Sequence, residues 1–191
     1  MSKGRLEAFS DGVIAILITI MVLELRVPEH TDLEALRPLV PVFISYVLSF
    51  VYLGIYWNNH HHLLQAARVV DGRVLWANMF LLFWLSLVPF ATAWMGEGGF
   101  APAPTALYGC VLLAAALGYS VLVRALRCVP GQADTLGAAS GADRKGLASV
   151  VIYASAIVVA IVAPFVAFGM YGVVAVIWFI PDRRVERALG A

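Results

Sequence analysis

The chain has 191 residues, of which 62% are hydrophobic and only 13% are charged. Soluble domains usually carry about 25% charged and about 45–50% apolar residues, so the composition excludes an ordinary soluble protein and predicts an all-α integral membrane protein with no soluble domain. The formal net charge is +1 and the chain has no basic run, so we expect no nucleic-acid partner.

The first apolar stretch, residues 5–26, is long enough to cross a bilayer, yet it carries Asp11 near its start. An ionisable group in a membrane span is costly and rarely faces lipid. The stretch also lacks a small-x-small cleavage site. We therefore expect a retained span rather than a signal peptide.

This first helix has two distinct faces. At 100° per residue, Ser10 and Asp11 point well away from a narrow, mainly apolar stripe. The stripe consists of Phe9, Gly12, Ile16, Ile20, Leu23 and Val27, with Thr19 at its edge. Such a stripe indicates helix packing more often than a pore, and a membrane Thr commonly bonds back to its own helix. The residues alone leave both interpretations open.

Hydropathy predicts five further spans, although the last apolar block, about 147–180, is too long for one helix of about 20 residues. We divide this block at a hairpin near Pro164. The predicted helices cover residues 5–26, 38–63, 74–95, 104–126, 147–163 and 166–181. The chain, 1–191, is then a single six-helix transmembrane domain.

The distribution of positive charge supports six spans. With the N-terminus in the cytoplasm, only Arg26 and Arg37 lie outside, and the other eleven of the thirteen Lys and Arg residues lie inside. This asymmetry agrees with the positive-inside rule. Five spans would weaken it by moving Arg183, Arg184 and Arg187 outside. We therefore expect both termini in the cytoplasm.

The connections between these spans are short. Residues 27–37 form an acidic outer loop in which Thr31 or Asp32 is a candidate helix cap. Residues 96–103 form an outer turn, and residues 127–143 form an inner loop rich in Gly, Ala and Ser.

Polar groups gather at the inner ends of three helices. Asp11 opens the first, the run WNNHHHLL (57–64) ends the second, and Arg73, Trp76 and Asn78 open the third. A buried carboxylate needs hydrogen-bond donors, so a packing network is one interpretation. A proton relay or pH sensor and a metal site are two others. Consecutive histidines on a helix diverge by 100°, so the three adjacent ones cannot all bind one ion.

Catalytic and cofactor motifs are missing from the sequence. There is no Walker A motif, no Gly-x-Ser-x-Gly, no His-Glu-x-x-His and no TVGYG-like carbonyl filter. Cys110 and Cys128 have neither metal nor redox spacing. We expect no enzyme activity, no cofactor and no resident metal.

One motif is specific. Arg5 is followed after three residues by Phe9, Ser10 and Asp11, an R-x-x-x-F-S-D signature, and the chain continues with GVIAILITIMVLEL and later YWNNHHHLL. In these segments it closely resembles the bacterial branch of the potassium channel family whose animal members sit in endosomes and lysosomes. The last three helices match that family in hydropathy only.

The resemblance implies one six-helix repeat per subunit, a homotetramer, and a central pore lined by the first helix, with K+ as the permeant ion. Carried over by position, Ile16, Ile20 and Leu23 would form the hydrophobic constriction, and Thr19 the hydroxyl layer tied to selectivity. The buried signature network would comprise Arg5, Phe9, Ser10, Asp11, His60, His61, His62, Trp76 and Asn78. Which histidine meets Asp11 stays open, because the three are adjacent.

The expected function is a potassium-selective or weakly selective cation channel in the plasma membrane of a bacterium. Rings of apolar side chains dewet when narrow, so the first helix must rotate or move outward to widen these rings before ions can pass. Glu24, just outside Leu23, would gather monovalent cations at the outer mouth. Two other classes remain: a proton-coupled carrier or proton-conducting protein that uses Asp11 and His60–His62, and a non-conducting membrane assembly protein.

Overall fold

The computed structural model describes residues 2–28, 30–131 and 143–179. Over these ranges the regular structure is helical and no strand forms, which confirms the all-α prediction. The elements are α1 (Lys3–Leu23), the 3₁₀ helix η1 (Leu33–Leu39), α2 (Val40–Ala66), α3 (Gly72–Ser86), α4 (Val88–Glu97), α5 (Pro102–Arg127), α7 (Asp143–Ala160) and α8 (Pro164–Phe179).

The third span is broken in its middle. It runs over Gly72–Glu97 as α3 and α4, with an interruption at Leu87. Pro89 explains the break, because proline has no N–H for the carbonyl of Leu85 and its ring crowds that carbonyl. The segment expected at 74–95 is therefore one span made of two helices.

Six apolar helical spans are present in the described part of the chain, the number that the sequence predicts. Four segments are long and apolar enough to cross a membrane: α1, η1 with α2, α3 with α4, and α5. The remaining two, α7 and α8, are shorter apolar helices.

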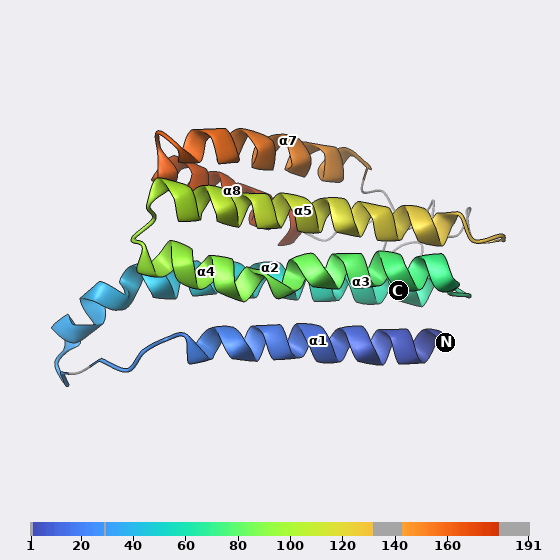
Figure 1. Cartoon of the computed structure of the whole chain (residues 1–191), viewed down its shortest axis with the longest axis horizontal. Helices are drawn as coiled ribbons and strands as arrows, with labels where there is room; N and C mark the ends of the chain where they lie inside the picture. The colour runs from blue at the N-terminus through green and yellow to red at the C-terminus, as the bar shows by residue number, and fades with distance from the viewer. Residues whose placement is uncertain (1, 29, 132–142, 180–191) are drawn as a thin grey trace.

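Successive spans run in opposite directions (Figure 1). The start of α1, the end of α2, the start of α3 and the end of α5 therefore lie together, at what we call the N-terminal end of the bundle. At one edge of the bundle α1 packs against α2, α3 and α4, and α7 lies at the opposite edge beyond α5.

Local sequence signals account for two connections. Asp32, one of the two candidate caps, accepts a hydrogen bond from the backbone N–H of Ala35 at 2.9 Å and begins η1. The last hairpin turns at residues 161–163, and Pro164 opens α8, where a missing N–H leaves no hydrogen bond unmade. The predictions that lie outside the described residues concern the loop at 132–142, the last residues of the sixth helix, and Arg183, Arg184 and Arg187.

The core between α2, α5, α7 and α8 is rich in buried tyrosines that bond across helices. Tyr52 donates to the Tyr171 carbonyl at 2.6 Å, and the Tyr171 hydroxyl donates to the Thr105 carbonyl at 3.0 Å. The Tyr171 hydroxyl lies against Gly109, where no larger side chain has room. These contacts hold the far side of the bundle together independently of α1.

Candidate functional site

One face of α1 is the face that packs inside the subunit. Its buried residues follow one another at intervals of three or four positions, the spacing of a single helix face. They are Leu6, Ser10, Ile14, Leu17 and Met21. This face meets α2, α3 and α4, so the rotation of α1 about its own axis is fixed by the rest of the bundle.

The opposite face of α1 is not covered by any helix of the subunit in the described residues. Ile16 is 57% exposed, Ile20 40% and Leu23 79%. The other stripe residues on the helix, Phe9, Gly12 and Thr19, are exposed as well, and so is Val27, which lies beyond the end of α1. Packing within the subunit therefore does not explain the stripe, and its partner must be lipid, water or another subunit.

Thr19 carries the hydroxyl of this uncovered stripe. Its Oγ1 donates back to the Ile16 carbonyl at 2.9 Å and lies 3.2 Å from the Ala15 carbonyl. This is the local bond that a membrane Thr commonly makes. A hydroxyl that donates its proton to the backbone keeps acceptor lone pairs, so the oxygen can still contact a cation.

Behind the stripe, a buried hydrogen-bond chain crosses three helices. His60 Nε2 on α2 donates to Asn78 Oδ1 on α3 at 2.7 Å, and Asn78 Nδ2 donates to Ser10 Oγ on α1 at 2.9 Å. Ser10 in turn donates to the Leu6 carbonyl at 2.9 Å. His60, Asn78 and Ser10 are all almost completely buried. Asn78 is therefore the central bridge between α1 and α2.

The hydrogen-bond chain from His60 to Ser10 determines the tautomer of His60. Because Asn78 uses its amide N–H toward Ser10, its carbonyl oxygen faces His60 and can only accept. His60 must then carry its proton on Nε2. Its Nδ1 is buried and has no hydrogen-bond partner among the described residues.

Asp11 belongs to a second, more exposed set of contacts. It accepts a hydrogen bond from Trp57 Nε1 at 3.0 Å. The Trp57 ring stacks on His61, with centroids 6.0 Å apart and planes 19° apart, and His61 Nε2 lies 2.9 Å from Gln65 Nε2. No histidine hydrogen-bonds Asp11 within the part of the chain that the structure describes, and His62 packs its half-buried ring on His61.

Three residues expected in the buried network are not buried within this subunit. Trp76 is 78% exposed, because it lies two positions before Asn78 and therefore about 200° around α3. Arg5 and Phe9 are also exposed. At 100° per residue both fall on the uncovered stripe of α1 rather than on its packed face.

Charged residues also lie at the C-terminal end of α1. Glu24 ends the helix and is exposed. Arg26, two residues further, pairs with Glu97 at the end of α4 with an N–O distance of 3.1 Å. No local pattern predicts this pair, because the two residues are far apart in the chain.

Two further features were missed by sequence reasoning. Trp57 lies in the conspicuous WNNHHHLL run, and its i,i+4 spacing from His61 was the available signal. In the half of the bundle away from its N-terminal end, Ser49 Oγ lies 2.7 Å from Thr92 Oγ1 and 2.9 Å from the Tyr108 hydroxyl. This cluster joins three spans, and only their packing reveals it.

No cluster of three or more His, Cys, Asp or Glu side chains that could hold a metal ion occurs among the described residues. We call the contacts around Ser10, Asp11 and His60 the polar layer. It contains the Asp11 carboxylate, bonded to Trp57, and the deeply buried His60 imidazole, bonded to Asn78. As built, the layer is best suited to holding helices together.

Comparisons with known proteins converge on one family. The family model described as the endosomal/lysosomal potassium channel TMEM175 matches residues 5–89. A potassium channel of a Chryseobacterium species is 49% identical over 189 residues, which cover 99% of this chain and 98% of the relative. The human endosomal/lysosomal proton channel TMEM175 is 33% identical over 103 residues, 48% of this chain and 20% of the human protein.

A solved structure agrees over the whole fold. The crystal structure of a lysosomal potassium-selective channel TMEM175 homolog from Chamaesiphon minutus matches with a TM-score of 0.78 and 27% identity. The match covers 99% of this chain and 98% of the other.

The Asn78 bridge yields a stability prediction. Asn78→Leu removes the hydrogen bonds to His60 and to Ser10 at once. The buried His60 Nε2–H and the Ser10 hydroxyl each lose a partner, and each unsatisfied group lowers the free energy of unfolding by about 1–3 kcal/mol. We expect a clearly lower thermal unfolding temperature of the detergent-solubilised protein, measured by circular dichroism, and loss of assembly on size exclusion.

Asn58→Leu is the matched control, because Asn58 is an exposed residue of α2. It should leave the unfolding temperature almost unchanged. Equal unfolding temperatures for the two variants would contradict the bridging role of Asn78.

Proposed function

This chain belongs to the TMEM175 family of potassium channels, and from that premise we propose that it is itself a potassium channel, in which α1 lines the central pore of a homotetramer. The observation that carries the proposal is the apolar stripe of α1, which no other helix of the subunit covers. The exposure of the stripe residues argues against the alternative that the stripe packs within the subunit.

Two polar residues favour a pore over lipid as the surroundings of the stripe. Thr19 lies along it, and Arg5 lies on the same face near the start of the helix. Charged and polar side chains within membrane spans usually face protein or a water-filled cavity rather than lipid. We therefore assign the stripe to the pore axis.

The position of α1 suits such an assembly. It lies at one edge of the bundle, with its packed face toward α2, α3 and α4 (Figure 1). Four copies can bring their α1 helices together around an axis without rearranging any subunit. The other helices would then form the outer wall.

The proposed constriction is a short apolar tube. Along α1, Ile20 lies about 6 Å beyond Ile16, and Leu23 about 4.5 Å beyond Ile20. Rings of these side chains dewet when narrow and block ions. Conduction then requires that α1 rotate or move away from the axis, which displaces Ser10 relative to Asn78 unless α3 moves with it.

Two oxygen-bearing residues complete the proposed ion path. Four Thr19 hydroxyls, whose lone pairs remain available, would replace part of the hydration shell of K+. At the outer mouth Glu24 would attract cations, because Arg26 already neutralises Glu97.

Proton conduction is the second candidate function, favoured by the name of the human relative. Against a relay through the polar layer, the chain from His60 through Asn78 to Ser10 ends at the Leu6 carbonyl, which cannot pass a proton on. Asp11 is bonded to Trp57 instead. A liposome flux assay that reads potassium and pH separately distinguishes the two functions.

The proposed location is the plasma membrane of a bacterium, with both termini in the cytoplasm, as the charge asymmetry favours. In a background without Cys110 and Cys128, Ser2→Cys at the start of α1 should react only with a reagent on the cytoplasmic side. Ala103→Cys at the start of α5 should react only from outside. Labelling of both positions from the same side would overturn the topology.

The constriction gives the most direct test of the pore. Ile16→Asn makes the ring easier to wet, so we expect a larger potassium flux in proteoliposomes and poorer discrimination against sodium. Val22→Asn is the matched control, because Val22 is also exposed but lies 120° away from Ile16 around α1. If Val22→Asn raised the flux as much as Ile16→Asn does, the pore could not lie on the stripe.

The selectivity role of Thr19 requires a separate substitution. Thr19→Val keeps the shape of the side chain and removes the hydroxyl. We expect the variant to assemble normally, because Thr19 bonds only its own helix, and to lose part of its preference for potassium in bi-ionic reversal-potential measurements. An unchanged potassium-to-sodium ratio in a well-assembled variant would show that the hydroxyl takes no part in selectivity.

A further inference from the structure

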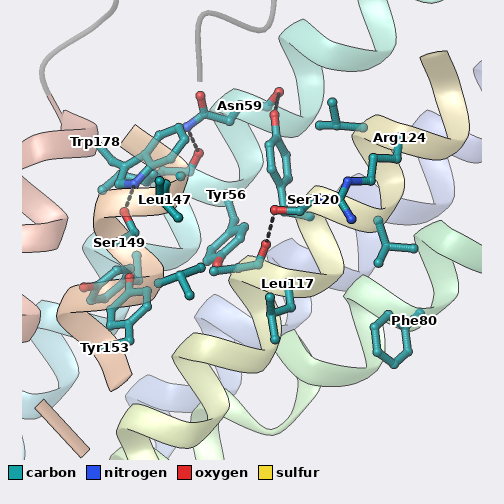
Figure 2. A pocket seen from close by; sticks show the side chains of 18 of the residues that line it. Tyr56, Asn59, Phe80, Leu117, Ser120, Arg124, Leu147, Ser149, Tyr153 and Trp178 are labelled. Atoms are coloured by element: carbon teal, nitrogen blue, oxygen red, sulfur yellow. Dashed lines mark hydrogen bonds between the residues drawn. The ribbon is translucent and has the colours of Figure 1, made fainter. Parts of the chain in front are cut away.

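A cavity of about 840 Å³ lies on the side of the subunit away from α1. Its walls come from α2, α3, α5, α7 and α8. Figure 2 shows Trp178, Leu147 and Ser149 on one side of it and Ser120 and Arg124 on the other. A volume of about 300–1,000 Å³ is typical of ligand sites, and nothing in the pore mechanism uses this one.

The cavity has an apolar body and a positively charged end. Aliphatic and aromatic side chains such as Ile55, Leu117 and Val150 line the body. Arg124 and Arg127, in the last turn of α5, line the end. None of the described lining residues carries a carboxylate.

Several neutral polar groups of the wall already bond within the protein. Asn59 Nδ2 donates to the Ile55 carbonyl at 2.8 Å, and Ser120 donates to the Ala116 carbonyl at 2.9 Å. Trp178 Nε1 donates to Ser149 Oγ at 2.8 Å. An occupant would find mainly apolar contact along the body and charged donors at the arginine end.

The dimensions of the cavity match one leaflet of a bilayer. Along α5 it extends from Ala116 to Arg127, about 16–17 Å of helix, and half of the hydrocarbon core is about 15 Å thick. The charged end lies at the N-terminal end of the bundle, where the membrane surface is expected. On the outer surface Leu117, Val121 and Leu147 are exposed, so the cavity opens sideways toward lipid.

We propose that this cavity binds an anionic phospholipid, with one acyl chain along the apolar body and the phosphate at Arg124 and Arg127. Basic pockets between transmembrane helices are suited to anionic headgroups, and arginine binds phosphate with two parallel hydrogen bonds. The site does not depend on ion conduction, because none of its lining residues belongs to α1.

The test is native mass spectrometry of the purified full-length protein after addition of palmitoyl-oleoyl phosphatidylglycerol or of phosphatidylcholine with the same chains. We expect the wild type to retain phosphatidylglycerol in preference to phosphatidylcholine. Arg124→Gln should lower the retention of phosphatidylglycerol about fivefold, the effect of one surface charge. Ser120→Phe, which fills the cavity from α5, should lower the retention of both lipids.

Arg73→Gln is the matched control. Arg73 is an exposed arginine at the same end of the bundle, on α3, and does not line the cavity. It should leave retention unchanged. Equal retention of the two lipids by the wild type, or equal losses in Arg124→Gln and Arg73→Gln, would overturn the proposal. So would retention of added oleate without any retention of phosphatidylglycerol.

The two arginine substitutions decide the matter even if Ser120→Phe fails to fold, because both change exposed side chains. Thermal unfolding of each variant, measured in lipid-free detergent, separates loss of the site from loss of the fold. A potassium flux assay tests the channel proposal separately. If that assay showed no conduction, the lipid-retention result would be unaffected.

Discussion

A polar side chain inside a membrane helix must find its partner within the protein, because lipid offers no hydrogen bond. This constraint orients α1. Ser10 is held by Asn78, which His60 holds in turn, and all three are buried. The rotation of α1 is thereby fixed on its polar side, and the apolar stripe on the other side is left uncovered. Because the face that carries Ser10 has to be buried, the apolar stripe is the face left to line the proposed pore.

The same arrangement links the proposed gate to the polar layer. A rigid helix cannot move Ile16 away from an axis without moving Ser10, about two turns earlier, against Asn78. Opening therefore has to preserve the bridge by moving α2 and α3 with α1, or break it at the expense of unsatisfied buried groups. His60 contributes stiffness in this view, because its Nε2 proton is committed to Asn78.

The two sides of the subunit differ in where their polar groups lie. On the α1 side, single polar groups are placed on an otherwise apolar helix, a pattern suited to a water-filled axis. On the α5 and α7 side, buried tyrosines bond across helices and a cavity opens toward the lipid-facing surface with two arginines at its end. Because no residue of α1 lines the cavity, the proposed lipid site and the proposed pore can be altered separately.

The sequence alone predicts the number of spans and the faces of the first helix, because both depend on local periodicity and on the distribution of charge. Six spans follow from hydropathy and the placement of Lys and Arg, and helix geometry alone puts Ile16, Ile20 and Leu23 on one face. Only the tertiary structure decided the partners: Asn78 for His60 and Trp57 for Asp11, while Trp76 points outward. Three adjacent histidines at 100° intervals are equivalent until the packing of α2 against α3 fixes its rotation, and a cavity between five helices has no counterpart in any one segment.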